Sequence, residues 1–253
     1  MVHRAARRLA LAGLGAVALA GCPKPLPTVP ALRSAAGGFQ DVRTLCLLPL
    51  RAQTELPKDR LRAFEDQLAG TLQRAGYGVV TADQTMAAYK RAVQALGGLF
   101  DPHTGQRDPS RYDAVRRQAL HALGGEVGCQ AILAATIAVV SAPFSEGNAH
   151  WDGMSAAVGR KGTGVLGWTA ALSLWVSIHN LDDQELLFNT GGIQTIADVE
   201  SGFWSNEFKA LPDSQLLADQ AINQYAINVS LGPILRARKS DPSQAAPSPN
   251  ATQ

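Results

Sequence analysis

The chain has 253 residues, of which 46% are hydrophobic and 17% are charged, with 23 basic side chains against 21 acidic ones and a formal net charge of +2. Residues 1–21 contain three arginines and no acidic residue, so the formal charge without them is −1. This balance lacks the clustered cationic surplus that binding to a polyanion requires, and we expect no nucleic-acid partner. The length allows one large domain or two small ones, and we expect one.

The N-terminus has the three parts of a secretory signal peptide. Arg4, Arg7 and Arg8 form a basic start, an apolar run follows from Leu9, and small residues precede Cys22. The run is too short to span a bilayer stably. An ordinary secretory peptide that ends near a cysteine would carry the same signals.

The tetrapeptide Leu19-Ala20-Gly21-Cys22 resembles the bacterial lipobox. In that motif the cysteine thiol is diacylated, the preceding peptide is removed and the new N-terminus is acylated. The resemblance implies that Cys22 carries acyl chains such as palmitate and holds the protein on a membrane surface without a transmembrane helix.

Composition divides the chain into four parts. We expect a signal peptide over residues 1–21, a tether rich in proline, alanine and glycine over residues 22–40, a single domain over residues 41–238, and a disordered tail without apolar periodicity over residues 239–253.

Strand and helix patterns alternate through the first half of the domain. Apolar runs predict strands over residues 44–50, 77–80 and 130–140. Helical spacing of apolar side chains, with proline, aspartate or glycine at the expected ends, predicts helices from Pro57 to Ala75, from Asp83 to Leu96 and from Pro109 to about Leu123.

The second half has a clearer strand signal. Between Leu172 and His179, alternate residues are apolar, which predicts a strand packed on one face. A polar turn over residues 181–185 then leads into a second strand, so the pair is typical of an antiparallel hairpin. A last helix is expected from Asp213 to Leu231, ending at Gly232-Pro233. Together these elements predict an α/β (α+β) fold, with a single mixed sheet, helices packed on it, an early βαβ unit and a late hairpin.

This order of elements is similar to a group of bacterial envelope lipoproteins with a compact α/β domain. The group includes the curli-secretion lipoprotein, the lipoprotein of Pel polysaccharide export and lipoprotein activators of peptidoglycan synthases. Its strand pattern G-A-D-x-I-L-x-G-x-I is matched by Gly128, Ile132, Leu133 and Ile137, while Cys129-Gln130 replaces Ala-Asp and Ala135 replaces the second glycine. The resemblance implies the fold and a role in building assemblies or binding partners.

Two thiols remain inside the predicted domain, Cys46 and Cys129, each in an apolar stretch. Exported proteins can oxidise such a pair. Free cysteine is also among the most buried residue types. Of these alternatives we favour two buried thiols over a disulfide.

Several motif-like stretches do not have the context that their chemistry requires. Residues 162–167 match G-x-G-x-x-G, but a strand pattern follows where a dinucleotide site needs a helix, so we expect no nucleotide. Residues 153–157 lack the second glycine of a nucleophile elbow. The histidines give no short-range ligand pair, so neither a metal nor another cofactor is expected.

Tryptophans mark the candidate contact surface. Trp151 and Trp168 flank a stretch rich in glycine and small residues, and exposed rings there could insert into a partner or a membrane interface; alternatively, both rings cover the sheet edge of their own domain. Trp175 lies on the strand face opposite the leucines and needs cover from a helix or another subunit. For Trp204 it is likewise open which helix or subunit covers its ring.

These observations predict a non-enzymatic envelope lipoprotein that faces the periplasm and acts through contacts with itself or with export or cell-wall machinery. Pro23 follows the lipobox cysteine instead of the aspartate associated with inner-membrane retention, which favours the outer membrane. The alternative is a periplasmic ligand-binding protein or a hydrolase on the same anchor, with His150, Asp152 and Ser155 as its candidate residues.

Overall fold

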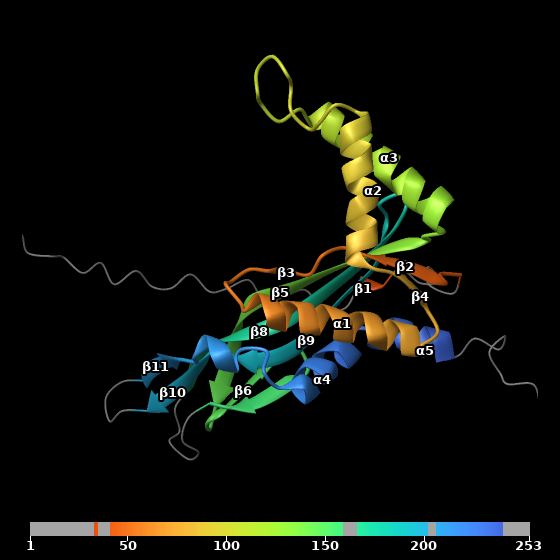
Figure 1. Ribbon diagram of the computed structural model, residues 1–253. Coiled ribbons are helices and arrows are strands. Elements are labelled where there is room, and N and C mark those ends of the chain that lie inside the picture. The colour runs from red at the N-terminus through yellow and green to blue at the C-terminus, as the bar shows by residue number, and fades with distance from the viewer. Residues whose placement is uncertain (1–32, 35–40, 159–165, 202–205, 240–253) are drawn as a thin grey trace, which may run out of the picture.

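The computed structural model describes residues 33–34, 41–158, 166–201 and 206–239 of the 253-residue chain (Figure 1). The predicted signal peptide with Cys22, most of the predicted tether and almost all of the predicted tail lie outside these residues. Arg33 and Ser34, within the predicted tether, form a short strand at one edge of the main sheet.

The described residues contain a nine-stranded mixed sheet, whose main path runs β1-β9-β8-β5-β2-β4. β3 and β6 also pair with β5, and β7 pairs with β6. The strands of this sheet are β1 (Arg33–Ser34), β2 (Thr44–Leu47), β3 (Arg51–Ala52), β4 (Gly78–Val80), β5 (Ala131–Ser145), β6 (Asn148–Trp151), β7 (Met154–Ala157), β8 (Leu166–Asn180) and β9 (Glu185–Thr195). β10 (Ala197–Ser201) and β11 (Asn206–Ala210) form a separate antiparallel pair.

The helices in the described ranges are α1 (Lys58–Arg74), α2 (Ala82–Ala95), α3 (Pro109–Val127), η1 (Asp213–Gln215), α4 (Gln220–Ser230) and α5 (Gly232–Lys239). The predicted α/β (α+β) class is confirmed: β2, α1 and β4 form the early βαβ unit with parallel strands, and β8 and β9 form the late antiparallel hairpin.

The C-terminal helix is the main error in the predicted elements. Instead of one helix from Asp213 to Leu231, the chain forms a 3₁₀ turn and two α-helices. The carboxylate of Asp219 accepts hydrogen bonds from the backbone of Ala221 and Ile222 and so starts α4 anew. Pro233 does not end the helical region, because it lies in the first turn of α5, where a missing N–H costs no hydrogen bond.

The largest apolar core lies between the sheet and the helices α1, α4 and α5. Leu172, Leu174, Val176 and Ile178 on β8 are fully buried there, as their alternation predicts. Phe64, Leu68 and Leu72 on α1, together with Ala226 and Ile227 on α4, cover this face.

The opposite face of the sheet is covered by two different structures at its two ends. At one end, α2 and α3 pack over Cys46, Val80 and Ile132. At the other end, the β6–β7 hairpin packs Ala149 and Trp151 against β5. The middle of this face therefore lies between two separate layers.

The helices α2 and α3, with the loop that joins them, form an arm that projects from the body of the domain (Figure 1). Thr81 begins α2 with a capping box, since its hydroxyl accepts from the Gln84 backbone and the Gln84 side chain binds the Thr81 backbone N–H in return. Asp108 caps α3 and Pro109 occupies its first turn, as predicted. The arm returns to the sheet at Cys129.

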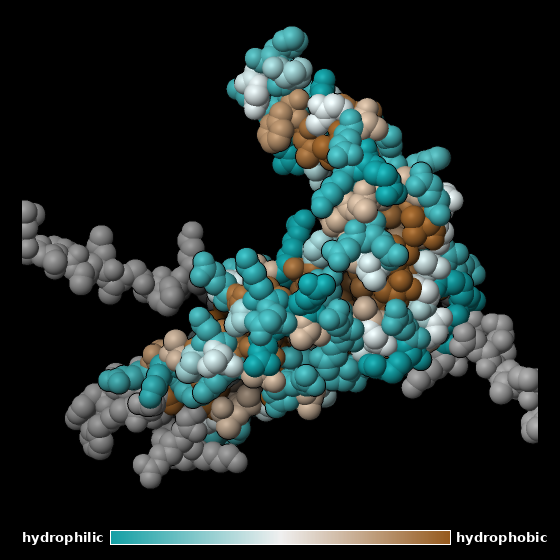
Figure 2. Space-filling model, viewed as in Figure 1, coloured by the Kyte–Doolittle hydropathy of each residue, from teal (hydrophilic) through white to brown (hydrophobic). Residues whose placement is uncertain are grey.

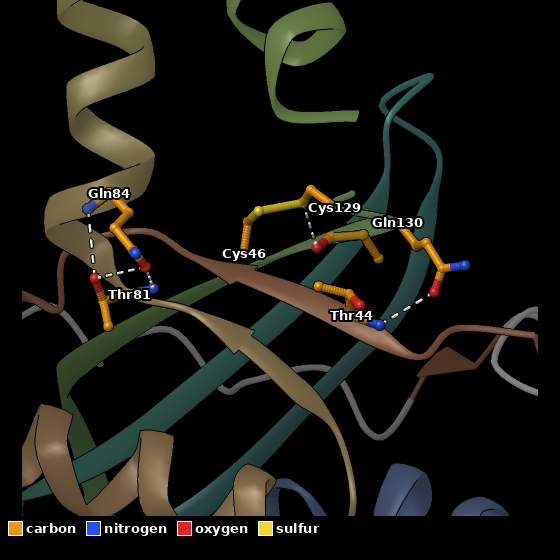
Figure 3. The surroundings of a disulfide bond; sticks show 7 residues. Thr44, Cys46, Thr81, Gln84, Cys129 and Gln130 are labelled. Atoms are coloured by element: carbon orange, nitrogen blue, oxygen red, sulfur yellow. Dashed lines mark hydrogen bonds between the residues drawn. A yellow bond between two sulfur atoms is a disulfide. The ribbon is translucent and has the colours of Figure 1, made fainter. Parts of the chain in front are cut away.

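The preference for two free buried thiols is wrong, because Cys46 and Cys129 form a disulfide whose Cα atoms are 5.8 Å apart (Figure 3). Two local features bring the thiols together. Gly128 ends α3 with φ +73°, a left-handed conformation that favours glycine, and turns the chain towards β2. The Gln130 side chain then accepts a hydrogen bond from the backbone N–H of Thr44.

Reduction of this disulfide is expected to destabilise the domain by about 4 kcal/mol, because the cross-link restricts a long loop in the unfolded chain. The two cysteines are 83 residues apart in the sequence. Urea unfolding followed by tryptophan fluorescence, with and without dithiothreitol, measures the difference. A Cys46→Ala/Cys129→Ala double variant should have the same unfolding midpoint as the reduced protein, and a Cys22→Ala variant should have the midpoint of the oxidised protein. Identical midpoints in all samples would refute the cross-link.

Candidate functional site

Trp151 is part of the domain's own packing. Its side chain is only 7% exposed, and its indole N–H donates a 3.0 Å hydrogen bond to the carbonyl oxygen of Leu172. The ring packs in a cluster with Val140, Phe144 and Val199. Of the two possibilities that the sequence left open for Trp151, the structure therefore shows the one in which the ring covers the sheet of its own domain.

Trp168, unlike Trp151, is largely exposed to solvent. It is 61% exposed and Leu166 is 75% exposed, and both belong to β8. Trp168 is directly opposite Pro143 of β5, which is also exposed. All three residues lie on the sheet face that α1 and α4 cover further along, so β5 and β8 extend beyond their helical layer. We call Pro143, Leu166 and Trp168 the strand overhang; residues 159–165, which precede it, lie outside the described residues.

Trp175 lies on the opposite sheet face, as the alternation predicts. Its ring meets Phe188 edge-on, with 6.2 Å between the ring centroids, and is partly covered. Its indole nitrogen is buried and has no hydrogen-bond partner among the described residues. Trp204 lies outside the described residues.

The three residues of the hydrolase alternative belong to the β6–β7 hairpin. His150 and Ser155 are cross-strand neighbours and both are exposed. Asp152 and Gly153 form the two-residue turn, with φ +41° and +77°, which is the conformation that an Asp-Gly hairpin turn adopts. The carboxylate of Asp152 accepts a hydrogen bond from the buried hydroxyl of Ser173, so it secures the hairpin to β8. The turn conformation and this hydrogen bond give Asp152 a structural role.

A cleft of about 370 Å³ lies where the arm meets the sheet, and sequence patterns gave no sign of it. In Figure 2, apolar surface is visible along the arm and near its junction with the body. The residues that line this arm cleft are Leu48, Arg51, Met86, Tyr89, Tyr112, Arg116, Leu120, Ile132, Ala134, His179, Asn180 and Asp183. They come from the segment just after β2, from β3 and β5, from the arm and from the β8–β9 hairpin, which are far apart in the sequence.

A polar row crosses one side of the arm cleft. The Arg116 guanidinium of α3 donates to the carboxylate of Asp183 in the β8–β9 turn, and this hydrogen bond raises the pKa of Arg116. The His179 ring nitrogen lies 3.8 Å from the same carboxylate. Burial raises the pKa of the Tyr89 phenol, although the neighbouring Arg116 charge opposes the shift. The ion pair therefore fastens α3 to the hairpin beside the cleft.

Two properties of the described residues bear on the kind of site. Within those ranges, no group of three or more His, Cys, Asp or Glu side chains is placed to hold a metal ion. None of the helices that the structure describes combines the length and the apolar character that crossing a membrane requires.

No protein-family model and no curated protein matches the chain. Similar solved structures include the PelC dodecamer from Paraburkholderia phytofirmans, with 11% identity, a TM-score of 0.37 and coverage of 81% of this chain and 94% of that one. The C-terminal domain of LpoB from Salmonella enterica has 14% identity, a TM-score of 0.32 and coverage of 63% and 87%. Lipoprotein GNA1162 from Neisseria meningitidis has 16% identity, a TM-score of 0.30 and coverage of 69% and 89%.

Replacing Asp183 with Asn is expected to loosen the arm without unfolding the domain. Both partners of the Arg116–Asp183 pair are partly exposed, so the loss of global stability should stay below about 1 kcal/mol. Hydrogen exchange followed by mass spectrometry should instead show faster exchange across α3. Asp182→Asn, at the neighbouring exposed position, is the matched control and should leave α3 unchanged; equal exchange in the two variants would show that the pair does not hold the arm.

Proposed function

We propose that this protein is a non-enzymatic envelope lipoprotein that is anchored through acyl chains on Cys22 and binds another protein through the strand overhang. The overhang partner is either a second copy of the chain or a component of export or cell-wall machinery. Pro23 after the anchor favours placement on the outer membrane, with the domain facing the periplasm.

The anchor rests on the sequence of the N-terminus. The basic start, the short apolar run and Leu19-Ala20-Gly21-Cys22 occur in the order that lipid modification requires. The Cys46–Cys129 disulfide supports export independently, because structural disulfides persist in oxidising compartments such as the periplasm.

The proposed contact surface is supported by one observation, the exposure of Trp168 on a regular strand. A tryptophan ring offers a large apolar area with little side-chain entropy to lose, which makes it a frequent centre of protein interfaces. Leu166 and Pro143 extend the apolar area beside it, and the long β5–β8 pairing keeps all three in place. A partner that covers the strand overhang would remove this apolar surface from water.

The mass of the mature protein tests the anchor. Processing and acylation should remove residues 1–21 and add acyl chains to Cys22, which intact-protein mass spectrometry of detergent extracts detects. A Cys22→Ala variant should keep its signal sequence and lack the added mass, since alanine has no thiol to acylate. A mature protein that begins at another residue, or carries no acyl mass, would overturn the anchor.

Native mass spectrometry tests the contact surface in the same extracts. If copies of the chain associate through the strand overhang, Trp168→Ser should shift the population towards the monomer, since truncating a central interface aromatic typically costs about 2 kcal/mol or more. Phe100→Ser is the matched control, because Phe100 is also exposed but lies in the arm loop.

If the wild type is already monomeric, photo-crosslinking from position 168 in cells should give a defined adduct that position 100 does not give. An oligomer unaffected by Trp168→Ser, or a monomer without a position-specific adduct, would exclude the strand overhang as the contact surface.

A further inference from the structure

We propose that the arm cleft is a binding site for a small organic anion with an apolar body, such as an aromatic or aliphatic carboxylate. This site is separate from the strand overhang and does not depend on the anchor. Its volume of about 370 Å³ lies within the range of pockets that hold small ligands.

The floor of the arm cleft is apolar and rigid. Ile132 and Ala134 lie on the same face of β5, which is the central strand of the sheet. Leu48 extends this floor, and its backbone N–H donates a 2.9 Å hydrogen bond to the carbonyl oxygen of Leu133. An apolar ligand body resting here would displace water from a surface that cannot hydrogen-bond it.

The arm supplies the facing wall. Met86 and Tyr89 come from α2 and Tyr112 from α3, so the ligand body would lie between aromatic or thioether side chains and the sheet. Two attachments join α3 to the body: the disulfide joins the end of the arm to β2, and the Arg116–Asp183 pair joins α3 to the β8–β9 turn. These attachments fix α3, and with it Tyr112, relative to the floor.

The charge of the arm cleft favours an anion. Arg116 is already neutralised by Asp183, and the same carboxylate faces His179. Arg51 is exposed and forms no ion pair with any residue that the structure describes. Because β3 pairs in parallel with β5, with Arg51 beside Thr136, Arg51 belongs to the same sheet face as Ala134. A ligand carboxylate at the rim would therefore meet an available guanidinium.

Two kinds of ligand share this chemistry, a compact aromatic acid and a fatty acid, and a neighbouring hollow would accommodate only the longer one. A second hollow of about 300 Å³ shares Met86, Tyr89, Tyr112 and Arg116 with the arm cleft and continues between α2 and α3. Its remaining lining includes the apolar residues Val93, Leu99 and Val115. A linear acyl chain could extend into this hollow, whereas a single ring would stay in the arm cleft.

Ligand-observed fluorine NMR on the full mature protein in nanodiscs tests the proposal, with empty nanodiscs as the blank. The probes are 4-(trifluoromethyl)phenylacetate, its neutral amide, and octanoate with a terminal trifluoromethyl group. Arg51→Gln should weaken binding of the carboxylate about tenfold and leave the amide within about twofold, since only the charged group uses the guanidinium. Arg62→Gln, an exposed arginine on α1, is the matched control and should change neither.

A second variant locates the apolar body. Ala134→Trp should fill the arm cleft and abolish binding of all probes, while Trp168→Ser at the strand overhang should leave binding intact; thermal unfolding checks that both variants fold. Tighter binding of the octanoate than of the aromatic acid, with this order reversed in Val93→Gln, would assign a lipid-derived ligand. Tighter binding of the aromatic acid would assign a soluble aromatic ligand. No binding, binding insensitive to Arg51→Gln, or binding lost in Trp168→Ser would each overturn the site.

Discussion

The pairing of β5 with β8 is the interaction on which the rest of the structure depends. Each residue of β5 faces a residue of β8, from Ala131 opposite Asn180 to Ser145 opposite Leu166. These two strands are longer than any single layer that covers them. One face of the ladder therefore supports the α1 and α4 core, the other supports the arm and the β6–β7 hairpin, and its far end forms the strand overhang.

Both candidate surfaces follow from this mismatch in length. Where the helical layer ends before the strands do, Trp168 remains uncovered although its strand still pairs with β5. Where the covering layers on the opposite face do not meet, a hollow remains between the arm and β5. The disulfide joins the end of the arm to β2.

The parts that could be predicted are those in which neighbouring residues determine the local structure. The alternation around Leu174 places the apolar side chains of β8 in the core, and Asp108-Pro109 begins α3, because strand period and helix capping depend on residues close in the chain. The prediction of a single helix from Asp213 is wrong, also because of a local interaction. Its apolar spacing was continuous, but the side chain of Asp219 offered a competing local hydrogen-bond pattern.

The sequence by itself determined the fold class, the βαβ unit and the hairpin, and it contains the lipobox-like motif, since each of these is encoded in local order and spacing. Only the tertiary structure decided that Cys46 and Cys129 pair, that Trp151 is buried whereas Trp168 is exposed, and that Arg51 and Tyr89 line one cleft. The two tryptophans occur in similar glycine-rich surroundings, so composition could not separate them. Their difference arises because Trp151 packs against one face of the sheet, whereas Trp168 lies on the other face beyond the end of its helical layer, and long-range strand pairing sets both positions.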